Sequence, residues 1–258
     1  MNIIACCKIV PEDQDIAVKP DRTLDLSKAE PKISQYDLNA IEAAIQIKEQ
    51  SGNANVVALS AGAAKTLGNS KIRKDILSRG VDSLTLVADD SLEGRLPADT
   101  ASVLAAAARK TGFDLILCGE GSGDIYAQQV GILLGEMLGV ASINGVSRIT
   151  AGDGTVLVER TLEDEIETLE LALPAVVSVT ADINTPRIPS LKTILAAGKK
   201  PTVTETLDGI GYQAPAPVAA MTSVKAPEQS DRKKKIIDGD SDADIKAFIE
   251  SIRPELTA

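Results

Sequence analysis

The stretch of this sequence best suited to ligand chemistry is a glycine-rich segment at residues 118–124, CGEGSGD, followed by IYAQQVG. Glycine lets a backbone approach a ligand closely and adopt positive φ. The segment joins a predicted strand to a predicted helix, and a helix N-terminus attracts phosphate through its free N–H groups and its dipole. Amide side chains just inside the helix could donate to phosphate oxygens. The candidate binding residues are Gly119, Gly121, Gly123, Gln128 and Gln129.

The same segment also fits a simpler interpretation, an ordinary strand-to-helix turn with Asp124 as the helix N-cap. Two acids, Glu120 and Asp124, disfavour a highly charged phosphate. The segment is not a P-loop, because no Gly-Lys-Ser/Thr follows it, and it is not the Gly-x-Gly-x-x-Gly fingerprint after a first strand. Both interpretations therefore remain open on spacing alone.

Other predicted strand ends carry weaker candidates. Lys8 follows the first strand and could face a phosphate or a flavin ring, although a solvated lysine is the simpler interpretation. Ser60–Gly62 ends the second strand with small residues that could admit a purine or merely pack tightly. Residues 34–37, SQYD, precede the first long helix and could recognise a base edge or cap the helix.

Several kinds of chemistry are excluded by composition. The sequence has no His, which removes Ser-His-Asp catalysis, Cys-His catalysis and His-ligated metals. The three cysteines form neither a disulfide framework nor a zinc spacing, so no metal site and a reducing compartment are expected. Cys6 and Cys7 lack the two-residue spacer of a redox pair. The acids of residues 163–167 resemble a general acid/base cluster, but a solvated turn fits them better.

Charge and hydropathy limit the possible partners. The net charge is −10, and the short basic run at residues 232–235 is isolated, so nucleic-acid binding is not expected. No segment approaches the roughly 20 apolar residues of a membrane span. The N-terminus shows no basic region followed by an apolar run and a cleavage site. We therefore expect a cytoplasmic protein that does not insert into membranes.

Strand and helix patterns alternate along the first 140 residues. Predicted strands at 2–10, 55–60, 83–87 and 114–118 alternate with predicted helices at 37–50, 64–79, 98–111 and 124–138. Such alternation predicts βαβ units with right-handed crossovers. The fold class is thus α/β, with a doubly wound, mostly parallel, Rossmann-like sheet. Ligands of such sheets bind beyond the carboxyl ends of the strands, where all the candidates above lie.

The pattern changes after Gly139. Predicted strands at 147–150, 155–160, 165–171 and 175–179 have short connections and could extend the sheet with antiparallel strands. We therefore divide the chain into an α/β domain at residues 1–201 and a C-terminal arm at 202–258. The arm is loop-like, with a possible strand at 236–237 and a helix at 242–252. It is too small to bury a core of its own and is expected to lie on a partner.

Four stretches of the sequence resemble one known family, that of the electron transfer flavoprotein beta subunits, and in particular its Fix-type bacterial branch. The first two are ACCKIV at 5–10 and the segment 34–42, which includes DLNAIE. The third is FDLILCG at 113–119, continuing through Asp124 and QQVG at 128–131. The fourth is LPAVV at 173–177, with NTPR at 184–187, Leu191 and the lysine pair 199–200; VER at 158–160 precedes it. The resemblance extends from end to end of the chain.

This resemblance implies a redox-silent subunit that is not itself an enzyme and works only with an alpha partner. FAD lies mainly in an alpha domain that rests against beta, and the flavin carries the redox chemistry. Beta binds an adenine nucleotide, which is AMP in ordinary members and a second FAD in electron-bifurcating ones. Matching the motifs residue by residue implies nucleotide contacts at Cys6 (through its backbone), Ser34, Gln35, Tyr36, Asp37, Ala61, Asp124, Gln128, Gln129 and Val130.

The resemblance further implies that the loop Pro189–Gly198 docks an acyl-CoA dehydrogenase, with Leu191 as its anchor. From the residues alone, Leu191 is an exposed loop leucine without a role. Three departures keep both AMP and FAD open. DLNAIE resembles the bifurcating members more than the AMP-binding ones, DIYAQQ at 124–129 differs from the usual residues of the bifurcating members, and Ser34-Gln35 replaces the family's usual pair. A stand-alone ATP- or AMP-binding stress-type module is the alternative of another class, but it explains neither the Leu191 loop nor the arm.

Overall fold

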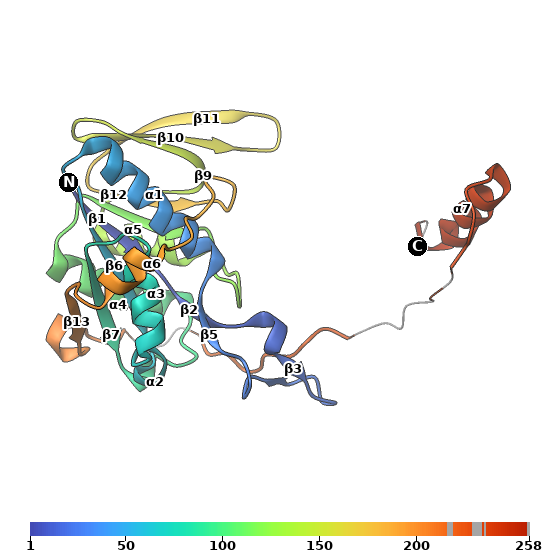
Figure 1. Cartoon of the computed structure of the whole chain (residues 1–258), viewed down its shortest axis with the longest axis horizontal. Helices are drawn as coiled ribbons and strands as arrows, with labels where there is room; N and C mark the ends of the chain where they lie inside the picture. Colours follow the sequence, from blue (N-terminus) through green and yellow to red (C-terminus); the bar gives the residue numbers. More distant parts are fainter. Residues whose placement is uncertain (216–218, 229–233, 235, 257–258) are drawn as a thin grey trace.

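In the computed structural model, which describes residues 1–215, 219–228, 234 and 236–256, a nine-stranded sheet forms the centre of the chain (Figure 1). Its strands follow the order β11-β10-β9-β12-β8-β1-β6-β7-β13. The central set, in which all neighbours pair in parallel, is β12 (Ala175–Val179), β8 (Leu115–Gly119), β1 (Asn2–Cys6), β6 (Asn55–Gly62) and β7 (Ser83–Ala88). The predicted doubly wound, mostly parallel α/β sheet is confirmed.

Helices cover both faces of this sheet. Side chains alternate along β1, so that Ile3 and Ala5 enter one core while Ile4 and Cys6 enter the other. The first core also holds buried side chains of α1 (Gln35–Ser51), α2 (Ala64–Leu67) and α3 (Ser70–Ser78). The second holds those of α4 (Pro97–Thr111) and α5 (Val130–Leu138). Aliphatic residues and alanines fill both cores, as expected for a parallel sheet buried on two sides.

An antiparallel extension follows α5, as the sequence predicted. β9 (Ala141–Ala151) pairs antiparallel with β10 (Thr155–Thr161), which pairs antiparallel with β11 (Ile166–Ala172). Grouping the strand at 175–179 with these antiparallel strands was wrong. β12 instead lies between β8 and β9 and pairs in parallel with both. The chain thus returns to the sheet centre after the hairpin.

The predicted first strand breaks at Cys7 and Lys8, where the chain leaves the sheet. An excursion follows, with β2 (Ile9–Pro11) paired to β5 (Pro31–Ile33) and β3 (Ala17–Val18) paired to β4 (Leu24–Asp25); η1 (Asp13–Asp15) lies between them. The excursion leads into α1, so residues 7–8 and 34–37 meet at one end of the sheet. Asp37, expected as an N-cap, lies inside the first turn, because α1 begins at Gln35.

Two other predicted helices differ in their bounds. The helix expected over 124–138 begins only at Val130, and residues 124–129 form a loop. The helix expected over 64–79 is divided into α2 and α3 at Gly68 and Asn69, because the Asn69 side chain accepts from Lys71 N–H and caps a new helix. Asn69 is a helix-capping residue that the sequence analysis did not use, and Asp124 is a capping residue type that begins no helix.

One short element, η2 (Asp90–Leu92), lies between β7 and α4. The remaining elements follow β12 toward the C-terminus: α6 (Leu191–Ala197), β13 (Thr202–Glu205), η3 (Asp208–Ile210) and α7 (Asp242–Leu256). β13, at the start of the predicted arm, pairs with β7 at the sheet edge. The strand expected at 236–237 is wrong, since both residues lack strand structure. Figure 1 places α7 apart from the sheet. No helix in the described part of the chain is long and apolar enough to span a membrane.

Arg187 fastens the segment before α6 to α1. Its Nε donates to Glu42 Oε2 at 2.7 Å, and its Nη1 donates to Glu49 Oε1 at 2.7 Å. Glu42 is buried, and the Arg187 guanidinium is the cation that forms an ion pair with its carboxylate in the described part of the chain. The NTPR motif therefore has a structural role in holding the two segments together.

Removing the guanidinium should leave the Glu42 carboxylate buried without its cation. We expect Arg187→Ala to lower the free energy of unfolding by about 3 kcal/mol, because an uncompensated buried charge is costly. Arg148→Ala is the matched control: its partner Glu159 lies 3.4 Å away and its side chain is 71% exposed, so the loss should stay below about 1 kcal/mol. Urea unfolding measures both, and equal losses would contradict the assignment.

Candidate functional site

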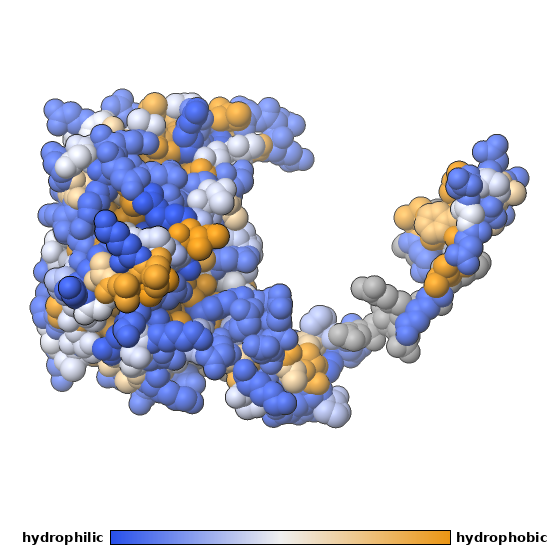
Figure 2. Space-filling view, viewed as in Figure 1, coloured by the Kyte–Doolittle hydropathy of each residue, from blue (hydrophilic) through white to orange (hydrophobic). Residues whose placement is uncertain are grey.

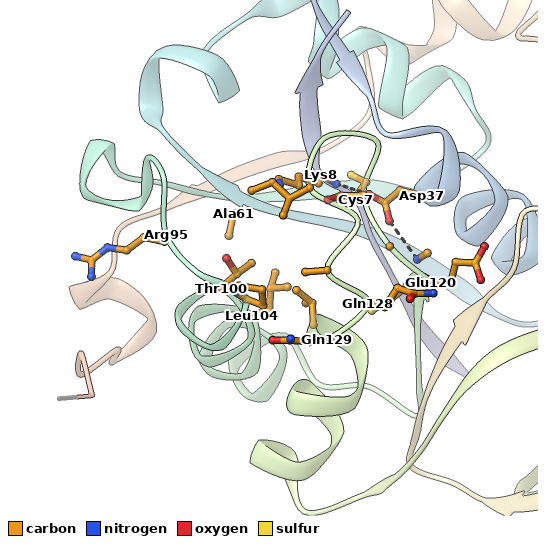
Figure 3. Close-up of a pocket in the computed structure, with 18 of the residues that line it drawn as sticks. Cys7, Lys8, Asp37, Ala61, Arg95, Thr100, Leu104, Glu120, Gln128 and Gln129 are labelled. Atoms are coloured by element: carbon orange, nitrogen blue, oxygen red, sulfur yellow. Dashed lines mark hydrogen bonds between the residues drawn. The ribbon is translucent and has the colours of Figure 1, made fainter. Parts of the chain in front are cut away.

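A cavity opens at the carboxyl ends of β1, β6 and β8, at the edge where ligands of open parallel sheets bind (Figure 3). Its walls come from the residues after β1, the end of β6, the glycine-rich loop and the start of α4. Seven of the predicted site residues line it: Asp37, Ala61, Gly119, Gly121, Gln128, Gln129 and Val130. The other six, which are Cys6, Ser34, Gln35, Tyr36, Gly123 and Asp124, lie in the same segments but do not line the cavity.

Asp37 ties the ends of two strands together behind this cavity. Its Oδ2 accepts the Lys8 N–H at 2.7 Å, and its Oδ1 accepts the Gly119 N–H at 3.1 Å. Ser34 adds a third tie, because its Oγ accepts the Gly123 N–H at 3.3 Å. The first turn of α1 therefore fixes both the chain after β1 and the glycine-rich loop after β8.

Burial raises the pKa of the Asp37 carboxyl to about 7, and the nearby Asp124 adds to the rise. The N–H groups of Lys8 and Gly119 act in the opposite direction, because they stabilise the charged form. The carboxyl therefore titrates near neutral pH. Its protonation state is then coupled to the geometry of both loop ends.

Lys8 and Asp124 form an ion pair across the mouth of the site. Lys8 Nζ lies 2.6 Å from Asp124 Oδ2, with side chains 44% and 25% exposed. Partial burial raises the pKa of Asp124, but hydrogen bonds from the Lys8 ammonium and the Ser122 hydroxyl together outweigh it, so the pKa lies below its usual value. Asp124 therefore serves neither as a helix N-cap nor as a free acid. The pair offsets the charge of Asp124, one of the two acids that disfavour a phosphate in this loop, and does not involve Glu120.

The glycines of the loop make room for the protein's own side chains. A Cβ on Gly119 would lie 2.7 Å from the Tyr36 backbone, and one on Gly121 would clash with the Tyr126 ring. The Tyr126 and Tyr36 rings pack with centroids 4.9 Å apart. Tyr126 and Gln128 both adopt positive φ, of 51° and 56°, which is uncommon for residues other than glycine. The loop is thus folded tightly against the first turn of α1.

The three cysteines are free and buried in this region. Cys6 follows Ala5, which pairs with Leu117, so Cys6 lies opposite Cys118 and shares its core, whereas Cys7 belongs to the other core. A hydrogen bond to Cys118 and burial raise the pKa of the Cys6 thiol, and burial raises that of Cys7 above its usual range. Neither thiol is therefore activated as a nucleophile.

Sequence reasoning missed the wall that α4 contributes. Arg95, Pro97, Thr100 and Leu104 line the cavity from the segment after β7. Figure 3 shows Thr100 and Leu104 beside Gln129, with Arg95 at the outer rim. The sequence predicted this helix and its strand, and the rule that ligands bind after parallel strands could have included its first turn. The omission arose because no glycine-rich signal marks the segment.

The structure also locates the acids of residues 163–167 and the predicted docking residue Leu191. Glu167 pairs with Arg160 on the hairpin, and residues 163–165 are exposed at its turn, which agrees with the solvated interpretation. Among the described residues no three Asp, Glu or Cys side chains gather in a metal-binding arrangement. Leu191 begins α6 with 73% of its surface exposed, remote from the cavity in sequence and outside its lining.

The fold and the cavity define a doubly wound α/β protein with a ligand pocket at the carboxyl ends of its central strands. Comparison with protein-family models identifies the family. Residues 22–209 match the model described as the electron transfer flavoprotein domain. The match covers well over half of the chain and includes the cavity loops after β6 and β8. The protein belongs to the electron transfer flavoprotein domain family.

The raised pKa of Asp37 predicts a specific dependence of stability on pH. Its folded pKa, about 7, exceeds the ordinary 3.8, so the associated stability is present below the unfolded pKa and is lost as pH rises through the folded one. Relative to Asp37→Asn, the wild type should lose about 4 kcal/mol of unfolding free energy between about pH 4 and pH 8.

Urea unfolding across this pH range measures the difference. Asp182→Asn, at an exposed carboxylate, is the control and should give a curve parallel to that of the wild type. If the Asp37→Asn curve also ran parallel to the wild-type curve, the assigned titration of Asp37 would be wrong.

Proposed function

We propose that this chain is the beta-type subunit of a heterodimeric electron transfer flavoprotein, and that its cavity binds an adenine nucleotide. The observation that carries the proposal is the position of the cavity. It lies at the carboxyl ends of β1, β6 and β8, and all of its lining residues except Cys7 and Lys8 belong to the segment that matches the family model. In this proposal the subunit positions a cofactor that carries the chemistry. The raised pKa values of the Cys6 and Cys7 thiols beside the cavity are consistent with that role, because neither thiol is an activated nucleophile.

The residues present suit such a ligand. Ala61 contributes only a methyl group to the cavity wall, which leaves space for a purine beside it, whereas Tyr36 and Tyr126 fill the space next to Gly119 and Gly121. Gln128 and Gln129 supply amide donors for ribose or phosphate oxygens, and the Lys8 ammonium lies at the mouth beside Asp124. AMP is the nucleotide we propose here; a second FAD, as in electron-bifurcating proteins, is the alternative.

In the proposed heterodimer, FAD bound mainly by the alpha subunit supplies the one- and two-electron chemistry. This chain contributes the adenine-nucleotide site and a surface on which the FAD domain rests. The complex accepts electrons from, or delivers them to, a flavoprotein dehydrogenase of the acyl-CoA type. The buried free thiols fit a reducing cytoplasm.

The C-terminal helix is the proposed contact with the alpha subunit. α7 exposes a stripe of apolar side chains at Ile245, Phe248 and Ile249, at the spacing of one helix face. None of its described residues is buried. An amphipathic helix with a free apolar face gains stability by packing against another surface, and the alpha subunit would provide it.

The loop that contains Leu191 is the proposed contact with the dehydrogenase. An exposed leucine at the start of α6 offers an apolar anchor of the kind that dominates transient interfaces. It lies outside the cavity lining, so docking and nucleotide binding would use separate surfaces of the same subunit.

Nucleotide analysis tests the proposal. The complex with its alpha subunit is purified and denatured, and the released FAD and AMP are quantified per heterodimer. One FAD and one AMP is the expected result, and two FAD without AMP would move the assignment to the bifurcating alternative. Gln128→Ala/Gln129→Ala should lower the nucleotide of this chain and spare the FAD of alpha, whereas Gln14→Ala, at an exposed position, should change neither. Neither nucleotide and no retained alpha subunit would contradict the proposal.

A further inference from the structure

An apolar surface lies on α6 and on the residue Ile188 just before it, although the protein as a whole is acidic. Figure 2 shows it as an orange area over α6 on the face toward the viewer. Its exposed side chains, with their exposed fractions, are Ile188 91%, Leu191 73%, Leu195 69% and Ile194 44%. Contiguous apolar exposure of this kind marks an interaction site. Ile188 lies outside α6 and is the most exposed of the four.

A groove runs between this surface and α3. Ile188, Pro189 and Ile194 form one wall, and Ser70, Lys71, Lys74, Asp75 and Ser78 of α3 form the other. Its volume is about 580 Å³, which is enough for a large apolar side chain and its neighbours. The surface therefore combines side chains that project outward with a recess that can receive one.

Charge on the groove opposes the charge of the whole chain. The chain carries −10, yet Lys71 and Lys74 line the groove, and Lys192 is exposed on α6 beside it. Lys74 and Lys192 have no ion-pair partner in the described part of the chain, and Lys71 meets only Glu30 at 3.5 Å. The one acid of the groove, Asp75, is paired with Arg79 at 3.1 Å. The groove therefore favours an acidic occupant.

Hydrogen bonds hold both walls in place. Arg79 Nη1 of the α3 end donates to the Arg187 carbonyl at 3.0 Å, next to Ile188. After α6, Lys200 Nζ donates to the Leu77 carbonyl at 2.9 Å. With Arg187 also fixed to α1, the recess is built before any partner arrives, which lowers the entropy cost of binding.

We propose that this groove receives an apolar side chain flanked by carboxylates on the flavoprotein dehydrogenase partner. The inference rests on the proposed function and specifies the chemistry of the partner surface. Docking is then two-sided: Leu191 projects outward, while an apolar side chain of the partner enters between Ile188 and α3. Lys71 and Lys74 select a partner with acids around that side chain, which also steers the encounter.

Electron transfer from an acyl-CoA dehydrogenase of the same organism to the purified heterodimer provides the test. The KM for the heterodimer is compared among variants at low and high salt. Lys71→Glu/Lys74→Glu should raise KM about tenfold at low salt and leave kcat nearly unchanged. The same variant should remove most of the salt dependence of KM. Ile188→Ser should raise KM about tenfold at either salt concentration.

Lys19→Glu/Lys28→Glu is the matched control, because it makes the same charge change on exposed lysines of the β3–β4 excursion. It should leave KM within about twofold of the wild type. If this control raised KM as much as Lys71→Glu/Lys74→Glu does, the effect would be a nonspecific one of net charge and the groove assignment would be overturned. Light scattering is a second readout: self-association of the heterodimer that Lys71→Glu/Lys74→Glu abolishes would make a second copy the occupant and contradict the proposal.

Leu191→Ala distinguishes a failure of the groove inference from a failure of the proposed docking at α6. If it raises KM while Ile188→Ser and Lys71→Glu/Lys74→Glu do not, the docking loop stands and the groove inference fails. If none of the three variants changes KM, docking of the dehydrogenase at α6 fails as well. If all three raise it, both are supported.

Discussion

One buried carboxylate determines how this end of the molecule is organised. Asp37 lies in the first turn of α1 and accepts N–H groups from the chain after β1 and from the end of β8, at 2.7 and 3.1 Å. The Lys8 donor lies just beyond β1 and the Gly119 donor is the last residue of β8, so both lie where the sheet ends. Without this acceptor, two backbone N–H groups would lose their partner at the base of the cavity. The shape of the pocket, the path of the glycine-rich loop and the position of the Lys8–Asp124 pair all depend on it.

The same helix connects the cavity to the apolar surface at α6, which is the proposed docking surface. At its start, Asn39 Nδ2 donates to the Asn184 carbonyl at 2.8 Å, and Asn184 returns a bond from its own amide to the Asn39 carbonyl at 3.0 Å. Further along the helix, Glu42 and Glu49 hold Arg187. α1 therefore braces the cavity with its first turn and the segment leading to α6 with the rest of its length. A rigid scaffold of this kind holds the proposed nucleotide site and the proposed docking surface in fixed relation.

The alternation of strands and helices was predictable because each element carries its own periodicity. Most of the predicted residues that line the cavity were predictable because parallel strands bring their carboxyl ends to one edge, whereas Val130 was implied only by the family resemblance. Long-range choices were not predictable. Nothing local to residues 175–179 indicates that β12 enters between β8 and β9. Asp37 has the sequence appearance of an N-cap, and only tertiary packing turns its carboxylate toward Lys8 and Gly119. The contribution of Thr100 was missed because a helix wall leaves no motif.

The central claim is that an adenine nucleotide binds where α1, β1 and β8 meet. Photolabelling of the purified heterodimer with 8-azido-AMP, followed by peptide mapping, tests it most directly. The account predicts label on this chain within residues 34–37, 59–61, 95–104 or 118–130, which line or border the cavity, and predicts that excess AMP prevents the labelling. Label that AMP displaces but that lies elsewhere, such as on the β10–β11 hairpin or on α7, would contradict it.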